Sequence, residues 1–134
     1  MKFLPSALMI MTMLSSLEIK AESATKPLVR IAELEIDPVQ LEAYTRAVTE
    51  EISTSIRVEP GVLAIYSVAI KNQPNHLRFF EIYADEAAYQ AHIASTHFQK
   101  YVVTTKQMIV SRKLFETVPL ALGAKPGSAI PGKE

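Results

Sequence analysis

The segment VLAIYSVAIKNQPNHLRFFEIYA, residues 62–84, decides the fold because it reads as two strands joined by a turn. Its first nine residues are rich in β-branched side chains, which favour strands. Residues 71–75, KNQPN, carry the Asn and Pro that are typical of a turn. In residues 76–84 alternate side chains form two sets, and both sets are largely apolar. Helices of the same chain would cover one face of this strand. The sheet of a second copy of the chain would cover the other face, which predicts a homodimer.

Periodic segments on either side of the hairpin complete the expected topology. Residues 28–36 alternate apolar and polar side chains, which is typical of a strand. Asp37 and Asp85 have the residue type of a helix N-cap, and the segment after each reads as a helix. Thr96 reads as the N-cap of a third helical run, and residues 109–118 read as a last strand. We therefore predict an α+β protein with the split β-α-β-β-α-β order of the ferredoxin-like fold and an antiparallel sheet.

The two ends of the chain lie outside the predicted domain, which covers residues 27–118. Residues 1–23 have a charged start, a short apolar core and then small residues, the pattern of a signal peptide. The apolar core, residues 3–14, is shorter than the ~20 residues that cross a bilayer, so we predict no membrane segment in the mature protein. We predict a periplasmic or secreted protein. Residues 119–134 read as a mobile tail or a short arm that lies on a partner.

Composition excludes several classes of function. A chain of 134 residues predicts one domain. Acidic and basic residues are equal in number, which argues against nucleic acid as a partner, because phosphate binding needs a concentrated positive face. The absence of cysteine excludes disulfides, thiolate metal sites and cysteine nucleophiles. No glycine-rich nucleotide motif is present in the sequence either.

Two of the three histidines lie in AHIASTHF, residues 91–98. On one continuous helix a spacing of five residues would turn their rings about 140° apart, and no third ligand is evident nearby, so we predict no metal site. His97 falls at the start of the third helix, where the helix dipole disfavours a charged imidazolium. A neutral ring there can accept or donate a proton, which makes His97 a candidate catalytic residue. The alternative is that His97 only packs or satisfies a backbone group at the helix junction.

Glu81 is the second candidate catalytic residue, because it lies in the middle of an apolar strand between Phe79 and Tyr83. Desolvation would raise its pKa and fit it for general base catalysis. The alternative is an ion pair with a basic residue such as Arg30 or Arg112. The side chains expected to line the same cavity and bind substrate are Tyr66, Tyr83, His92, Phe98 and Tyr101.

The segments EPGVLAIYSV (59–68) and FFEIYADEAAYQAHIASTHFQKY (79–101) together resemble the antibiotic biosynthesis monooxygenase family. The resemblance extends over residues 29–118. The family pattern is a Glu-Pro-Gly or Glu-x-Gly before the second strand, a Glu-x-Trp or Glu-x-Tyr on the third, and an Ala-His-x-x-(Ser/Thr)-x-His-Phe run after it. The matching residues here are Glu59, Pro60, Gly61, Glu81, Tyr83, Ala91, His92, Ser95, His97 and Phe98.

The resemblance implies a ferredoxin-like α+β fold whose sheets pair in a dimeric α+β barrel. It also implies a pocket between sheet and helices, with Glu81, Tyr83, His92 and His97 near it. Members of the family include cofactor-free monooxygenases that oxidise quinols or polyketide phenols with O₂, haem-degrading enzymes and an isomerase of a phosphorylated autoinducer. The chain departs from many members by carrying Tyr83 in place of Trp, Thr96 in place of Pro, and a signal peptide, which argues against cytoplasmic substrates.

Three functions follow as alternatives. The first is a cofactor-independent monooxygenase of a small quinol or phenol, which needs no metal or cofactor because an electron-rich substrate anion can reduce O₂ directly. Glu81 or His97 would be the base, and Tyr66 and Tyr83 would orient the ring. The second is a haem-binding or haem-degrading protein with a histidine as axial ligand. The third is a non-catalytic exported dimer that binds a small apolar ligand.

Overall fold

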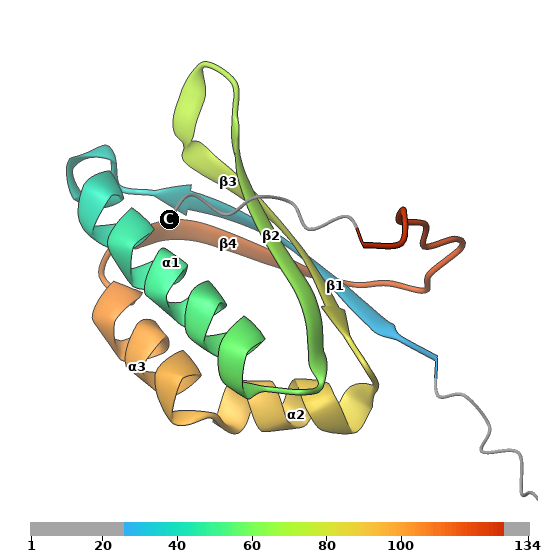
Figure 1. Cartoon of the computed structure of the whole chain (residues 1–134). Coiled ribbons are helices and arrows are strands. Elements are labelled where there is room, and N and C mark those ends of the chain that lie inside the picture. The colour runs from blue at the N-terminus through green and yellow to red at the C-terminus, as the bar shows by residue number, and fades with distance from the viewer. Residues whose placement is uncertain (1–25, 128–134) are drawn as a thin grey trace, which may run out of the picture.

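The computed structural model describes residues 26–127, and it confirms the predicted α+β class. Its elements follow the β-α-β-β-α-β order of the ferredoxin-like fold, with the second helical part divided into two helices (Figure 1). The predicted signal peptide, 1–23, and the end of the predicted tail, 128–134, lie outside the described residues. The elements are β1 (Leu28–Ile36), the 3-10 helix η1 (Pro38–Gln40), α1 (Leu41–Val58), β2 (Val62–Ile70), β3 (Gln73–Tyr83), α2 (Glu86–Ala94), α3 (Thr96–Thr105) and β4 (Ile109–Glu116).

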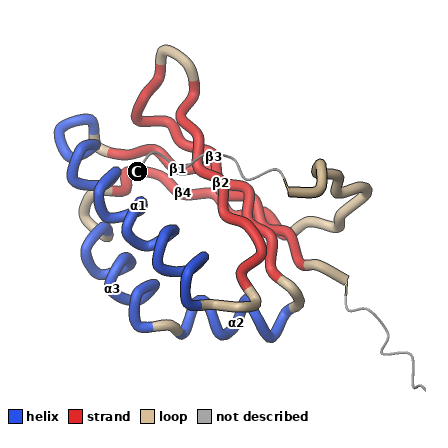
Figure 2. Tube along the Cα trace, in the orientation of Figure 1, coloured by secondary structure: helices blue, strands red, loops and turns tan. Residues whose placement is uncertain are grey.

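The four strands form one antiparallel sheet in the order β2-β3-β1-β4. The helices α1, α2 and α3 all lie on the same side of this sheet (Figure 2). None of the described helices is long and apolar enough to cross a membrane. The domain therefore consists of two layers, and no helix among residues 26–127 lies over the second face of the sheet.

The core fills the space between the sheet and α1. Successive side chains of a strand point to opposite faces, so every second residue of β1 and β3 points toward the helices. The register places Ala32 opposite Phe79 and Leu34 opposite Leu77, and all four are buried. Tyr44 of α1 is fully buried against this cluster. Since burying a large apolar side chain contributes roughly 1.5–3 kcal/mol, this core fixes α1 relative to the sheet and so positions the residues of the site.

The opposite face of the sheet is apolar and exposed within one chain. The side chains of Tyr66, Val68, Phe80 and Phe115 on β2, β3 and β4 are between 37% and 59% exposed. Contiguous apolar patches on soluble proteins commonly mark interaction surfaces. The homodimer predicted from the sequence would bury this face.

The ends of β3 and β4 differ from the sequence prediction. β3 begins at Gln73, three residues earlier than predicted, because the chain turns within Lys71 and Asn72. Asn72 has a φ of 68°, a conformation that asparagine tolerates and that tight hairpin turns require. β4 ends at Glu116 rather than at residue 118. The hairpin is therefore tighter than the sequence indicated.

Two helix caps also differ from the prediction. Asp37 caps the 3-10 helix η1 that precedes α1, whereas Asp85 caps α2 as predicted. Ser95, not Thr96, is the N-cap of α3, and its hydroxyl accepts the backbone N–H of Phe98 at 3.3 Å. The Ser95 hydroxyl therefore lies at the junction of α2 and α3, where the two neighbouring histidines meet.

Gly61 immediately precedes β2 and lies close to Ala88 of α2. A methyl group on Gly61 would lie 2.5 Å from the Cβ of Ala88, so we expect Gly61→Ala to push α2 away. The expected loss in the free energy of unfolding is about 1–3 kcal/mol, measured by urea denaturation. Gly123→Ala is the matched control, because nothing lies within 4 Å of the added methyl group. Equal free energies of unfolding in the two variants would contradict this packing.

Candidate active site

A cavity of about 100 Å³ lies between the helices and the covered face of the sheet. A second recess, of about 450 Å³, shares four wall residues with it, among them Glu81 and Tyr89, and so adjoins it. For comparison, an apolar cavity of about 150 Å³ can hold benzene. The two spaces together are therefore large enough for a small aromatic molecule. The polar side chains in the cavity wall are Glu51, Glu81, Tyr83, Tyr89, His92, Tyr101 and Arg112.

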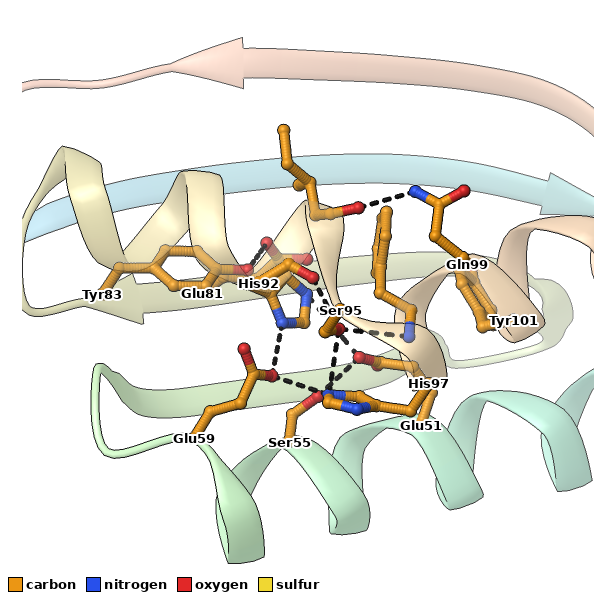
Figure 3. A network of polar contacts seen from close by, with 12 residues as sticks. Glu51, Ser55, Glu59, Glu81, Tyr83, His92, Ser95, His97, Gln99 and Tyr101 are labelled. Atoms are coloured by element: carbon orange, nitrogen blue, oxygen red, sulfur yellow. Dashed lines mark hydrogen bonds and ion pairs between the residues drawn. The ribbon is translucent and has the colours of Figure 1, made fainter.

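His92 and His97 converge on one carboxylate, that of Glu59 (Figure 3). Oε2 of Glu59 lies 2.9 Å from Nδ1 of His92 and 2.8 Å from Nε2 of His97. Glu59 follows the last turn of α1, His92 is in the last turn of α2, and His97 is in the first turn of α3. Burial acts to raise the pKa of Glu59, but the hydrogen bonds from His92 and His97 outweigh it and hold the pKa below its ordinary value. Glu59 is therefore an ionised acceptor between two imidazoles.

Glu51 lies on the other side of His92, on the buried face of α1. It is 7% exposed, and its Oε1 accepts the hydroxyl of Ser55 at 2.7 Å. The same oxygen lies 3.6 Å from Nε2 of His92. Burial raises the pKa of Glu51 more than the Ser55 hydrogen bond and the histidines lower it. His92, which is 3% exposed, thus sits between two carboxylates of different character.

Glu81 and Tyr83 form a second polar pair on the same face of β3. The hydroxyl of Tyr83 donates to Oε2 of Glu81 at 2.7 Å. Burial raises the pKa of both groups, so Tyr83 remains a hydrogen-bond donor. The alternative prediction of an ion pair to Glu81 is wrong, because Arg30 pairs instead with Glu116 at 2.9 Å, and no ion pair joins Glu81 to Arg112 within residues 26–127.

The raised pKa of Glu81 has a consequence for stability as a function of pH. A carboxyl whose pKa is higher in the folded state favours folding when protonated. That contribution is fully present below the unfolded pKa and is lost as the pH rises through the folded pKa. Glu81→Gln removes the ionisation, so we expect the stability of the variant, relative to the wild type, to increase between pH 4 and pH 8. Urea denaturation at a series of pH values measures this, and a difference that stays constant or falls over the range would contradict it.

The structure brings most of the predicted site residues together. Glu81, Tyr83, His92, Phe98 and Tyr101 all contribute to the wall of the cavity. The prediction that these side chains share one cavity therefore agrees with their positions, although their roles stay predictions.

His97 and Tyr66 lie elsewhere. His97 is in the wall of a separate recess of about 40 Å³ on the far side of Glu51. The placement of Tyr66 in the cavity was wrong: Tyr66 pairs with Phe80 on β3, and residues paired across strands point to the same face, which here is the one away from the helices. A shift of one residue moves a strand side chain to the other face. The pairing of β2 with β3 is irregular between Val62 and Ala64, and the sequence does not reveal this irregularity.

Glu51 and Ser55 were not predicted as partners in the site, and Glu59 was predicted only as part of a motif. The signal for the first two was present. Glu51 and Ser55 are four residues apart on α1, on the same face as buried Val48. Polar residues on an apolar helical stripe need buried partners. The partners themselves depend on the tertiary packing of α1 against α2 and α3.

A third candidate ligand for a metal ion, which the sequence did not reveal, lies beside the histidines. Glu51, His92 and His97 each offer one atom, and these atoms lie within 4.8 Å of one another. Both rings are also hydrogen-bonded to Glu59, through Nδ1 of His92 and Nε2 of His97, at distances typical of hydrogen bonds. We interpret the cluster as a hydrogen-bonded network, in which the second nitrogen of each ring is not engaged by Glu59.

Comparison with known proteins agrees with this architecture. The family model described as antibiotic biosynthesis monooxygenase matches residues 27–104. A provisionally assigned antibiotic biosynthesis monooxygenase from Bacteroides thetaiotaomicron VPI-5482 is 48% identical with a TM-score of 0.72, over 75% of this chain and 95% of that one. A provisionally assigned monooxygenase from Lactobacillus acidophilus NCFM is 31% identical with a TM-score of 0.65, over 66% of this chain and 42% of that one.

The protein PA3566 from Pseudomonas aeruginosa, at 23% identity, has the same fold, with a TM-score of 0.67 over 73% of this chain and 98% of that one. No curated protein matches the chain. The family match covers more than half of the chain, and the Bacteroides structure is similar over nearly its whole length. The chain belongs to the antibiotic biosynthesis monooxygenase family.

Proposed function

We propose that the protein is a cofactor-independent monooxygenase that oxidises a small quinol or phenol with O₂. One observation carries this proposal: Glu81 and His92, two groups that can act as a base, lie among the ionisable side chains in the wall of a small, mostly apolar cavity with a larger recess beside it. Such a site can bind an aromatic ring, remove its phenolic proton and keep out water. Membership of a monooxygenase family supports the same function.

The reaction balances with O₂ as the sole oxidant. The base takes the phenolic proton, and the anion reduces O₂ and forms a C–O bond at a ring carbon that carries hydrogen. The base returns its proton to the distal peroxide oxygen. It then takes the proton from that carbon as the O–O bond breaks, and the leaving hydroxide receives this proton and departs as water. One phenol and one O₂ thus give one quinone and one water.

The structure changes which residues we propose for the base. His97 is not in the wall of the cavity, so a substrate bound there would meet Glu81 or His92 first. Tyr83, which donates to Glu81, would orient the substrate from the same face of β3. Tyr66 lies on the other face of the sheet and has no part in this cavity within one chain.

Oxygen uptake tests the proposal. The purified protein is given a panel of hydroquinones and naphthols in the presence of a chelator, without added flavin or metal. The expected result is uptake above the buffer rate with at least one of them, at one O₂ per substrate molecule. Absence of uptake with the whole panel would contradict the proposal, and a Soret band on haem titration would then favour a haem protein.

We also propose that a second copy of the chain covers the open sheet face to give a homodimer. Phe80→Glu places a charge in the middle of this apolar surface and should convert the dimer to a monomer. Light scattering after size exclusion measures the mass. Val39→Glu is the control, since Val39 is 92% exposed on η1 and should leave the dimer intact. A wild-type monomer, or a Phe80→Glu dimer, would contradict this arrangement.

Export of the protein to the periplasm or the medium is a proposal that rests on the sequence of residues 1–23. The test is the mass of the protein recovered from each cell fraction. A shortened chain outside the cytoplasm is the expected result, and a full-length cytoplasmic chain would contradict it.

A further inference from the structure

We propose that Glu59 is a positioning residue that fixes the tautomer of His92, so that Nε2 of His92 takes the substrate's proton. In this arrangement His97 is a second hydrogen-bond donor to Glu59 and not the base. The inference rests on the proposed function and names the base within it. It follows from the direction of each hydrogen bond in the cluster.

The hydrogen bond between Glu59 and His92 shows which nitrogen of His92 carries the hydrogen. An ionised carboxylate only accepts hydrogen bonds. Oε2 of Glu59 lies 2.9 Å from Nδ1 of His92, so Nδ1 must carry the hydrogen. In a neutral ring the other nitrogen, Nε2, is then the acceptor. A carboxylate that holds a histidine in one tautomer is the arrangement by which serine hydrolases keep their general base ready.

The contacts of His97 with Ser95 and Glu59 show that Nε2 of His97 is a hydrogen-bond donor. The Ser95 hydroxyl has one hydrogen, and it donates this to the backbone carbonyl of His92 at 2.7 Å. Nε2 of His97 lies 3.2 Å from the same hydroxyl oxygen and 2.8 Å from Glu59. Neither neighbour can donate to it, so Nε2 of His97 is a donor to both. His97 therefore holds Glu59 in place and has no unprotonated nitrogen directed at that carboxylate.

Nε2 is the nitrogen of His92 that can accept a proton from the substrate. This nitrogen lies 3.6 Å from Oε1 of Glu51, beyond hydrogen-bond distance, and that oxygen already accepts the hydroxyl of Ser55. His92 and Glu51 both contribute to the cavity wall, so a phenolic O–H bound in the cavity can reach this nitrogen.

Proton transfer from the substrate gives His92 a positive charge, and a carboxylate beside the ring stabilises that charge. The titratable groups that face His92 are Glu51, Glu59, Glu81, Tyr83 and His97. Once protonated, His92 would lie between Glu51 and Glu59, and the ionised carboxylate of Glu59, 2.9 Å from Nδ1, stabilises the charge. Glu81 differs from His92 in already accepting a hydrogen bond from Tyr83, so its role is to hold the cavity wall and orient substrate.

The experiment is ¹⁵N NMR of the histidine rings in chelator-treated protein, which shows directly which nitrogen carries the hydrogen. In the wild type we expect the neutral His92 ring to be protonated on Nδ1. In Glu59→Gln we expect that preference to be lost, while His76 on β3, the third histidine, serves as an unchanged internal control. His97→Gln keeps the Glu59 carboxylate as the partner of His92 and should retain the His92 tautomer. Circular dichroism confirms that each variant is folded.

Kinetics complete the test. Oxygen uptake by Glu59→Gln should show a kcat lower by about 100-fold or more with little change in KM, as expected when a general base is lost. His97→Gln should lose less than tenfold. A wild-type His92 that carries its hydrogen on Nε2, or that is doubly protonated at the pH of activity, would overturn the inference. So would a Glu59→Gln variant with unchanged tautomer and rate, or a Zn²⁺ titration in which both rings bind the metal. Failure of the proposed function would look different, since no variant or wild type would then oxidise any phenol.

Discussion

His92→Gln will lower kcat for phenol oxidation by about 100- to 10,000-fold, the range that general base catalysis supplies. Glutamine occupies a similar space and forms hydrogen bonds, but it cannot take a proton at neutral pH. Binding of the aromatic ring depends mainly on the apolar wall, so KM should change little. Steady-state oxygen uptake measures both constants.

His76→Gln is the matched control for this prediction. His76 is on β3, 35% exposed, 4.0 Å from Glu35 and outside the cavity wall. Its replacement should leave kcat within about twofold, a change of less than 0.5 kcal/mol in the barrier. A His92→Gln variant as active as His76→Gln would show that His92 is not the base and would shift that role to Glu81.

Tyr83→Ala will lower the free energy of unfolding by about 3–5 kcal/mol, as expected for truncating a fully buried aromatic side chain. Tyr83 packs edge to face on Tyr89, with ring centres 5.2 Å apart, and its hydroxyl is the donor to Glu81. Tyr83→Phe keeps the ring but leaves the Glu81 carboxylate without that donor, which should cost about 1–3 kcal/mol. Urea denaturation separates the two contributions.

The control for the Tyr83 series is Val103→Ala on α3, whose side chain is 77% exposed. A loss of less than about 0.5 kcal/mol is expected there. If Tyr83→Ala lost no more free energy of unfolding than Val103→Ala, the Tyr83 ring would not contribute to the packing between the cavity and the core. If Tyr83→Phe cost as much as Tyr83→Ala, the hydroxyl rather than the ring would carry the stability.

The sequence predicted the fold well because its signals are local. The alternation in residues 28–36, the hairpin in residues 62–84 and the cap at Asp85 depend only on side-chain period and turn chemistry. Errors at the ends, such as Thr96 in place of Ser95 as N-cap, arose because serine and threonine have the same capping chemistry and differ here by one position.

The site was predicted less completely because it depends on contacts between distant segments. Glu59 meets His92 and His97 across 33 and 38 residues of sequence, and the spacing within AHIASTHF gives no indication of the shared carboxylate. Tyr66 was assigned to the wrong face because both faces of β2 carry apolar residues, so alternation alone does not say which one meets the helices. Glu81 and Tyr83 were easier to predict, since they share a face with buried Leu77 and Phe79.

The most direct test of the proposed chemistry is oxidation under ¹⁸O₂ with mass spectrometry of the product. The substrate is the phenol that gives the highest oxygen uptake, with chelator present and no added cofactor. The account predicts one labelled oxygen atom in each quinone molecule formed by the wild type, and a rate of labelled product that falls at least about 100-fold in His92→Gln. An unlabelled quinone would show that O₂ only removes electrons, and a labelled product formed equally fast by His92→Gln would show that the chemistry lies elsewhere; either result would contradict the account.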